Sequence, residues 1–369
     1  MTIETWTRWQ PAIEAEGMAF APAPEYDVFP RPGEFLKPYQ AVERATGVTR
    51  QVVRSLRPDV VVSDVLTLAP ALAAELEGVP AGTLIPHVDP RGAPGFPPYS
   101  LGARLPRTAT GRRLWRLFDP LLARGLELGR TELNETRRRL GLPPLAYVHG
   151  GISRRLALVA TLPQLEYPRP DPEPNTYVVG PLQWEPEAFD VELPDGDPSW
   201  PVVLVAPSTA QDGEQRMLRA ALRGLADLPV RVLATTNRRE PSGGLGTVPR
   251  NARVVDWVSY SRTMPRCDLV VCHAGHGTLV RSLSSGCAVV ACPAAGDMNE
   301  NAARVDWAGA GVRLPRRLVS ARGLRLAVQR ALAEPRLRAR AREIAAWAEA
   351  HDAGARAAEL VEGLAERRE

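Results

Sequence analysis

The residues best suited to chemistry gather between Asp268 and Asn301. An apolar run, DLVVC, leads there into the motif HAGHGT at His273–Thr278, and residues with helical spacing follow. The glycines allow a ligand to approach the backbone closely, and the start of a helix offers unpaired N–H groups with a partial positive charge. Such a turn suits an anion like a diphosphate, to which the His273 ring and the Thr278 hydroxyl could add donors.

A second turn of the same kind, Pro293–Asn301, follows the next apolar run and carries Asp297. The carboxyl ends of parallel strands meet at one edge of a sheet, so we expect the Asp297 carboxylate to point at the same crevice. A carboxylate accepts hydrogen bonds and could hold hydroxyl groups beside a bound diphosphate. The two turns together are stronger evidence for a ligand site than one glycine-rich turn.

These turns must be positioned by strands and helices, which alternate along the chain. In the first half the predicted strands are Asp59–Ser63, Pro80–Ile85, Leu156–Ala160 and Tyr177–Gly180. In the second half they are Val202–Ala206, Val230–Ala234, Arg253–Val255, Asp268–Cys272 and Ala288–Cys292. Helical spacing separates them, and a long Arg- and Leu-rich helical stretch runs from Gly111 to Leu140. The alternation predicts an α/β fold with two Rossmann-like doubly wound domains that face a cleft.

The length of 369 residues is typical of about two domains. An acidic, proline-rich stretch, EPEAFDVELPDGDPSWP, interrupts the alternation and lacks any periodicity. We therefore predict an N-terminal domain over residues 1–182, a linker over 183–200, and a C-terminal domain with terminal helices over 201–369.

The charge and the apolar runs exclude several classes of protein. The net charge of +4 is spread along the chain, without the basic cluster or the module that nucleic-acid binding requires. No apolar run is long enough to span a membrane, and the N-terminus does not resemble a secretory signal. These observations predict a cytoplasmic protein. The four cysteines have a poor spacing for zinc and are expected to be reduced structural thiols.

Several motifs together resemble family-1 glycosyltransferases with the GT-B fold. The matching pieces are VVGPL at 178–182, VDWV at 255–258, HAGHGT at 273–278 and GDMNENAARV at 296–305. They are most similar to the bacterial branch that glycosylates natural products such as macrolides. The resemblance implies inverting transfer of a sugar from a nucleotide diphosphate to a hydroxyl of a small hydrophobic aglycone. It also implies that neither a metal nor another cofactor is needed.

The resemblance also assigns roles to particular residues. The residues implied for the diphosphate are Ser208, His273, Gly275, Gly277 and Thr278. Trp257 would stack on the base of the donor, with the Val258 backbone at the base edge, and Asp297 would bind the sugar hydroxyls. Two alternatives stay open, because Trp257 could be a core aromatic residue and Ser208 an ordinary turn residue. His276 is expected to be structural.

Two departures from the family pattern bear on the donor. Arg281 stands where many members have a Glu that accepts hydrogen bonds from the ribose, and Met298 stands where glucose-transferring members often have Gln. Both changes weaken recognition of a hydroxyl-rich donor. A dTDP-(deoxy)sugar is therefore favoured, with a UDP-sugar as the alternative.

A third departure concerns the first strand, Gly-His turn and helix of the family, whose His is the usual base. Met1–Glu16 resembles the end of the second family strand and the helix after it, so the first unit is expected to be missing. A start codon assigned too late is the simplest explanation. Asp64 matches the Asp that orients the base and would lack its partner His, and His87 could be a substitute base or an acceptor contact.

Two functions follow from this departure. The first is a glycosyltransferase whose acceptor pocket is formed by Pro86–Arg104 and the helix after it. The second is a non-catalytic partner that binds a nucleotide-sugar and assists a true transferase.

Overall fold

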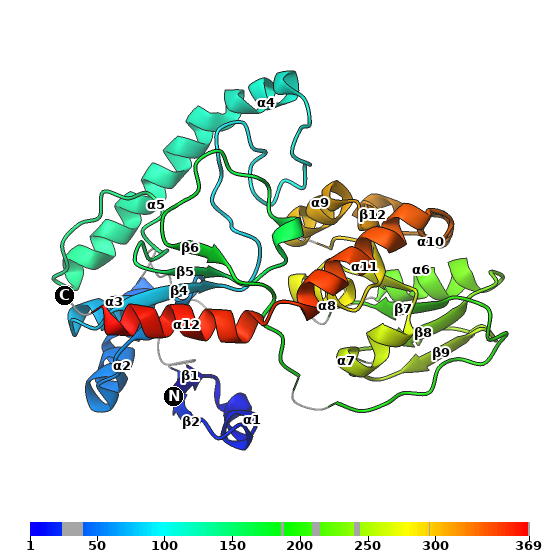
Figure 1. Ribbon diagram of the computed structural model, residues 1–369, viewed down its shortest axis with the longest axis horizontal. Helices are drawn as coiled ribbons and strands as arrows, with labels where there is room; N and C mark the ends of the chain where they lie inside the picture. The colour runs from blue at the N-terminus through cyan, green and yellow to red at the C-terminus, as the bar shows by residue number, and fades with distance from the viewer. Residues whose placement is uncertain (24–39, 186–187, 209–214, 240–243, 295, 368–369) are drawn as a thin grey trace.

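The structure is a computed structural model that describes residues 1–23, 40–185, 188–208, 215–239, 244–294 and 296–367. Within these ranges the chain forms two larger parallel sheets, surrounded by helices, and one small sheet near the N-terminus. The two larger sheets lie in separate halves of the molecule (Figure 1). The predicted α/β fold with two Rossmann-like domains is confirmed. No helix in the described ranges is long and apolar enough to cross a membrane.

The first domain is built around a four-stranded parallel sheet. Its strands, in spatial order, are β3 (Val61–Asp64), β4 (Ala81–Ile85), β5 (Ala157–Val159) and β6 (Thr176–Val178). Helices α2 (Gln40–Leu56) and α3 (Ala69–Leu76) pack against each other beside it. The predicted strands agree with these to within a few residues.

The predicted helical stretch from Gly111 to Leu140 consists of three consecutive segments. They are α4 (Ala109–Trp115), a short 3-10 turn (Arg116–Phe118) and α5 (Asp119–Arg139). Thr108 accepts a hydrogen bond from the Gly111 amide and so caps α4. The C-terminal half of α5 packs on the first domain through Leu133, whereas α4 lies at the upper edge of the molecule in Figure 1.

The chain begins with a small sheet of its own. Strand β1 (Thr2–Thr5) pairs in parallel with β2 (Ala19–Pro22), and α1 (Gln10–Ala15) connects them. The strand and helix agree with the resemblance noted for residues 1–16. In the described part of the chain neither strand pairs with β3. The hydroxyl of Thr49 in α2 donates to Glu4 at 2.9 Å and attaches this unit to the first domain.

The second domain contains a six-stranded parallel sheet. Its strands, in spatial order, are β12 (Gly311–Arg313), β11 (Ala288–Ala291), β10 (Leu269–Cys272), β7 (Val202–Ala206), β8 (Arg231–Thr235) and β9 (Ala252–Val255). Its helices are α6 (Arg216–Leu225), α7 (Tyr260–Thr263), α8 (His276–Ser284), α9 (Met298–Ala308), α10 (Ala321–Ala333) and α11 (Pro335–Glu349). The predicted strand Val202–Ala206 coincides with β7, and the helical spacing expected around the HAGHGT motif corresponds to α8.

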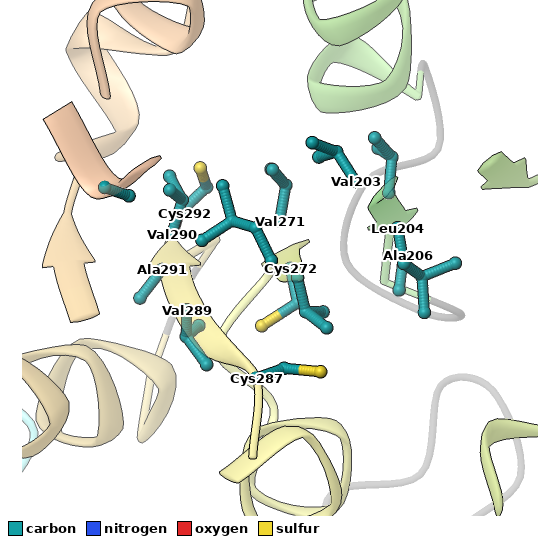
Figure 2. Packing of buried hydrophobic residues seen from close by; sticks show 14 of the residues in the cluster. Val203, Leu204, Ala206, Val271, Cys272, Cys287, Val289, Val290, Ala291 and Cys292 are labelled. Atoms are coloured by element: carbon teal, nitrogen blue, oxygen red, sulfur yellow. The ribbon is translucent and has the colours of Figure 1, made fainter. Parts of the chain in front are cut away.

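Valines of adjacent strands fill the core of this second sheet (Figure 2). Val203, Val271 and Val289 are fully buried, as expected for parallel strands covered on both faces. The four cysteines are free, and three of them are buried. Burial raises the pKa of the Cys272 and Cys287 thiols to about 12, so both stay protonated and act as small apolar side chains.

The last helix, α12 (Ala353–Glu366), leaves the second domain and packs on the first sheet. Ala357 and Leu364 of α12 contact the cluster formed by Leu156, Leu158 and Val179. The predicted C-terminal domain, residues 201–369, includes this helix. Its packing on the sheet of the first domain is visible only in the structure. The two domains are joined by the chain between β6 and β7, where the linker is predicted, and also by this returning helix.

Candidate functional site

The residues predicted to bind the donor follow strands of the second sheet. Ser208 follows β7, Trp257 and Val258 follow β9, His273 follows β10, and Asp297 follows β11. These strands are all parallel, so the residues lie at the same, carboxyl edge of the sheet. Figure 1 shows that this edge faces the first domain. The topology therefore gathers residues that are far apart in the sequence.

The turn after β10 has an unusual backbone. Ala274 adopts a φ of 61°, in the left-handed region that L-residues with a side chain rarely occupy. A Cβ atom on Gly275 would lie 2.3 Å from Nε2 of His273, so the imidazole ring rests directly on this glycine. A larger residue at this position would displace the His273 ring, whose Nδ1 lies 3.4 Å from the Ala206 carbonyl.

The first turn of α8 borders open space. Gly277 is exposed, and a Cβ atom added there would meet no other atom within 4 Å. The glycine is thus not required by contacts inside the protein. The amides at the start of α8 carry the partial positive charge of a helix N-terminus, which makes the space above Gly277 suitable for an anion.

A buried asparagine, which the sequence patterns do not single out, joins the two predicted turns. Nδ2 of Asn301 donates to the Ala274 carbonyl at 3.0 Å and lies 3.5 Å from Oδ2 of Asp297. Its backbone amide donates to the Asp297 carbonyl at 3.0 Å. The side chain is only 2% exposed. One amide therefore holds the HAGHGT turn and the exposed Asp297 in a common arrangement.

Trp257 is half-buried and carries a cation on one ring face. The guanidinium of Arg238, which follows β8, lies 4.9 Å from the centre of a Trp257 ring. At this distance the pair makes a cation–π contact. Val258 is buried in the core of the domain, so it presents its backbone rather than its side chain to the strand edge.

Ser208 is buried at the end of β7, next to residues that lie outside the described ranges. Thr278 is half-buried in the first turn of α8, near the side chain of Tyr260. Both hydroxyls therefore lie at strand or helix ends of the same edge. In the described ranges no three His, Cys, Asp or Glu side chains lie close enough together to hold a metal ion.

The first domain contributes the opposite wall. His87 follows β4, and its Nδ1 donates to the Val88 carbonyl at 2.7 Å. His276 at the start of α8 lies 2.9 Å from the hydroxyl of Thr161, which follows β5. Burial, reinforced by the nearby His87, lowers the pKa of His276 to about 3. His276 is therefore neutral at physiological pH and joins the two domains, in agreement with its expected structural role.

The loop after β4 also reaches the donor side. The buried hydroxyl of Tyr99 has no hydrogen-bond partner among the described residues. Burial, and then the negative charges of Asp297 and Glu300, raise the pKa of this hydroxyl. Because Tyr99 belongs to the predicted acceptor loop, this loop lies against the turn that carries Asp297.

Asp64 ends β3 and has a local partner. Its Oδ1 accepts a hydrogen bond from the Leu66 amide at 2.7 Å, which closes the turn between β3 and α3. The side chain is only half-buried. Its role in orienting a base stays a prediction.

Comparison with known proteins gives the same reading of the fold and the motifs. Residues 219–366 match the family described as the C-terminal domain of proteins like erythromycin biosynthesis protein CIII. The chain is 32% identical over 319 residues to 4'-demethylrebeccamycin synthase from Lentzea aerocolonigenes. The aligned region covers 83% of this chain and 74% of that relative.

Solved structures of glycosyltransferases share the fold. The calicheamicin glycosyltransferase CalG4 has a TM-score of 0.73 at 22% identity, over 99% of this chain and 91% of that one. The glycosyltransferase VinC, solved in complex with DTDP, has a TM-score of 0.67 at 21% identity, over 100% and 92% of the two chains. The identity to the rebeccamycin relative, sustained over most of both chains, shows that this protein belongs to the family-1 GT-B glycosyltransferases of natural-product biosynthesis.

Proposed function

We propose that this glycosyltransferase transfers a sugar from a nucleotide diphosphate donor to a hydroxyl of a small hydrophobic aglycone, with inversion at the anomeric carbon. A single observation carries the donor half of the proposal. Asn301 joins the HAGHGT turn to Asp297 beside the open space over Gly277. Such a site offers hydrogen-bond donors to a diphosphate and an acceptor to sugar hydroxyls within one crevice.

In the proposed reaction the acceptor oxygen forms a bond to the anomeric carbon while the bond from that carbon to the diphosphate oxygen breaks. The negative charge that develops on the diphosphate is stabilised by the N-terminus of α8 and by His273. No metal or other cofactor is part of the proposal. The acceptor proton passes to a base on the side of the first domain.

His87 is the residue that we assign to the acceptor side. Its Nδ1 donates to the Val88 carbonyl, so in the neutral ring Nε2 carries the lone pair that accepts a proton or a hydroxyl hydrogen. Its neighbour His276 belongs to the donor domain, which puts His87 between the two halves of the site. Asp64 is assigned a positioning role on the same side.

For the donor base we favour thymine, and Trp257 with the Val258 backbone forms the proposed base site. Arg281, at the predicted ribose position, donates to the Trp184 carbonyl at 3.1 Å and lies 3.9 Å from Glu185. Because a guanidinium carries only N–H donors, Arg281 cannot accept a hydrogen bond from a 2′-hydroxyl. The structure of VinC with DTDP supports the same choice by analogy.

The donor proposal is tested by binding of dTDP and UDP and by one glycine variant. Calorimetry with the full chain should give tighter binding of dTDP than of UDP. Gly277→Val should abolish dTDP binding, because its side chain fills the space proposed for the diphosphate. Gly363→Val in α12 is the matched control, since a Cβ atom at Gly363 also meets nothing within 4 Å. Equal or tighter UDP binding would refute the choice of thymine.

The acceptor half is tested by product formation from a dTDP-sugar and a panel of aglycones, followed by NMR of the anomeric centre. Inverted product supports the proposal, and retained configuration contradicts it. Donor binding without any turnover, also after a strand and Gly-His turn are added before Met1, would favour the non-catalytic partner instead.

A further inference from the structure

Residues 107–128, called here the arm, form a helical projection with no buried side chain. Between Leu105 and Leu133, a stretch that the structure describes throughout, every side chain is exposed or half-exposed. The arm includes α4 and the first half of α5 and extends to the upper edge of the molecule in Figure 1. Most helices in proteins are stabilised by packing of an apolar face, so an arm of this length with no covered face lacks its usual support.

One side of the arm is nevertheless apolar. This apolar stripe consists of Leu114, Trp115, Leu117, Phe118, Leu121 and Leu122. At 3.6 residues per turn these side chains cover about half of the helix circumference. Leu114, Leu117 and Leu121 are 61%, 75% and 68% exposed, and the rings of Trp115 and Phe118 lie 5.2 Å apart. A contiguous exposed patch of this kind marks an interaction surface.

The other side of the arm is basic. The helical arginines are Arg112, Arg113, Arg116 and Arg124. The same helix spacing places Arg112 and Arg116 opposite the stripe and Arg113 and Arg124 beside its Leu117 edge. In the part of the chain that the structure describes, Arg113, Arg116 and Arg124 form no ion pair. The acidic residues of the arm are Asp119 and Glu127, and Glu127 pairs with Arg130. The arm therefore carries a net positive charge next to its apolar stripe.

We propose that the arm docks on the surface of an anionic lipid bilayer. A helix with Trp, Phe and Leu on one face and Arg on the other lies in the plane of a membrane interface, with its apolar face at the acyl boundary. The arginines would then lie at the level of the lipid phosphates. The proposal concerns surface attachment, and it does not depend on the donor or acceptor proposed above.

Two features of the arm favour a bilayer over a protein partner. The stripe contains no side chain that is a strong hydrogen-bonding group apart from the Trp115 indole, whereas protein interfaces carry about one hydrogen bond per 100–200 Å². The arginines also complement the phosphates of anionic lipids, a charge match that a second copy of this arm, which is itself basic, does not offer.

The test is sedimentation of the full-length chain with two kinds of vesicle. We expect binding to vesicles of phosphatidylcholine and phosphatidylglycerol in equal parts, loss of that binding at high salt, and little binding to phosphatidylcholine alone. The double variant Leu117→Glu/Leu121→Glu should abolish binding. Arg113→Gln/Arg116→Gln should weaken it about 30-fold, which corresponds to about 1 kcal/mol for each charge.

Leu326→Glu in α10 is the matched control, because Leu326 is also an exposed leucine on a helix. Each variant is checked for its melting temperature and for dTDP binding, so that misfolding is recognised. Failure to bind anionic vesicles, or equal loss in the Leu326 variant, overturns the proposal. A dimer that dissociates in the Leu117/Leu121 variant, without vesicle binding by the wild type, would assign the stripe to a second copy instead.

Discussion

At the scale of single residues, Asn301 has the largest structural consequence in the proposed donor site. Its amide nitrogen donates to the carbonyl of Ala274, a residue held in the left-handed region. Such a conformation costs free energy and persists only when its surroundings hold it in place. The hydrogen bond from Asn301 is one contact that does so, and it comes from the helix that begins after Asp297.

Replacing this residue tests whether the two turns depend on it. In Asn301→Ala the buried Ala274 carbonyl loses its donor, which costs about 1–3 kcal/mol of folding free energy. We also expect weaker dTDP binding, because the HAGHGT turn and Asp297 are no longer joined. Urea unfolding and calorimetry measure the two effects.

Asn299→Ala is the control for that substitution. Asn299 belongs to the same turn of α9, but Nδ2 of its side chain makes only a long contact of 3.4 Å with the Gly296 carbonyl. We expect the free energy of unfolding of Asn299→Ala to differ from that of the wild type by less than about 0.5 kcal/mol. Wild-type stability and dTDP binding in Asn301→Ala would show that the turns are held independently of this side chain.

The residues of the site differ in how far the sequence could reveal them. His273, Gly275 and Asp297 belong to motifs that are contiguous in the chain, so local patterns identify them. Arg238 and Tyr99 have no such pattern. They meet Trp257 and the Asp297 turn only because separate strands end at one edge of the fold. Contacts of this kind depend on the tertiary arrangement, which periodicity does not encode.

At the scale of elements, the strands of the second sheet were predictable because they are buried on both faces. Val202–Ala206 is fully apolar and forms β7 without a shift of either boundary. Two elements gave weaker signals. Strand β12 has only three residues, and α2 is a long helix whose sequence is rich in polar residues and contains a glycine.

The linker is an element in which a single carboxylate makes several contacts. Glu185 accepts hydrogen bonds from the hydroxyls of Ser259 and Ser261 at 2.8 and 2.6 Å and from the Tyr260 amide at 2.8 Å. It thus attaches the linker to the start of α7, next to Trp257 and Val258. Burial alone would raise the pKa of Glu185, but these hydrogen bonds outweigh it and lower the pKa below 4.5.

The lowered pKa of Glu185 predicts a pH dependence with a definite sign. The unfolded state binds a proton more readily than the folded state, so this contribution to stability is complete well above pH 4.5. It is lost as the pH falls through the folded pKa. We therefore expect Glu185→Gln to be less stable than the wild type at pH 7, with a difference that shrinks toward pH 3.

Urea unfolding over this pH range measures the effect, and Glu192→Gln is the comparison. Glu192 also lies in the linker but makes a single exposed ion pair with Arg253. A difference between Glu185→Gln and the wild type that stays constant with pH would show that the Glu185 charge is not stabilising.

At the scale of the whole molecule, the two domains are joined by more than the linker. Helix α12 returns to the first sheet, and His276 contacts Thr161 across the boundary. Arg304 of α9 makes several contacts at this boundary. It donates to the Leu165 carbonyl at 3.0 Å and pairs with Glu166 at 3.1 Å, and within α9 it pairs with Glu300 at 2.8 Å. These contacts hold the donor turn of α9 against the first domain.

Replacing the Arg304 guanidinium tests this connection. Arg304 is only 2% exposed, and Arg304→Met would leave the buried carboxylate of Glu300 and the partly buried carboxylate of Glu166 without their shared cation. Loss of one partner of a buried ion pair typically costs about 3–5 kcal/mol. We expect a loss of this size in urea unfolding followed by tryptophan fluorescence, with a partial recovery in Arg304→Met/Glu300→Gln.

A surface ion pair gives the matched control, because it shares the chemistry of Arg304 without its burial. Arg340 pairs with Glu343 at 2.9 Å on the exposed side of α11, and Arg340→Met should change stability by less than about 1 kcal/mol. The contrast depends on whether the domain boundary is dry. If the boundary admits water, the two carboxylates remain solvated after the substitution, and Arg304→Met then unfolds at the same urea concentration as Arg340→Met. That result would show that the domains are held together by the linker and α12 rather than by the buried charges of α9.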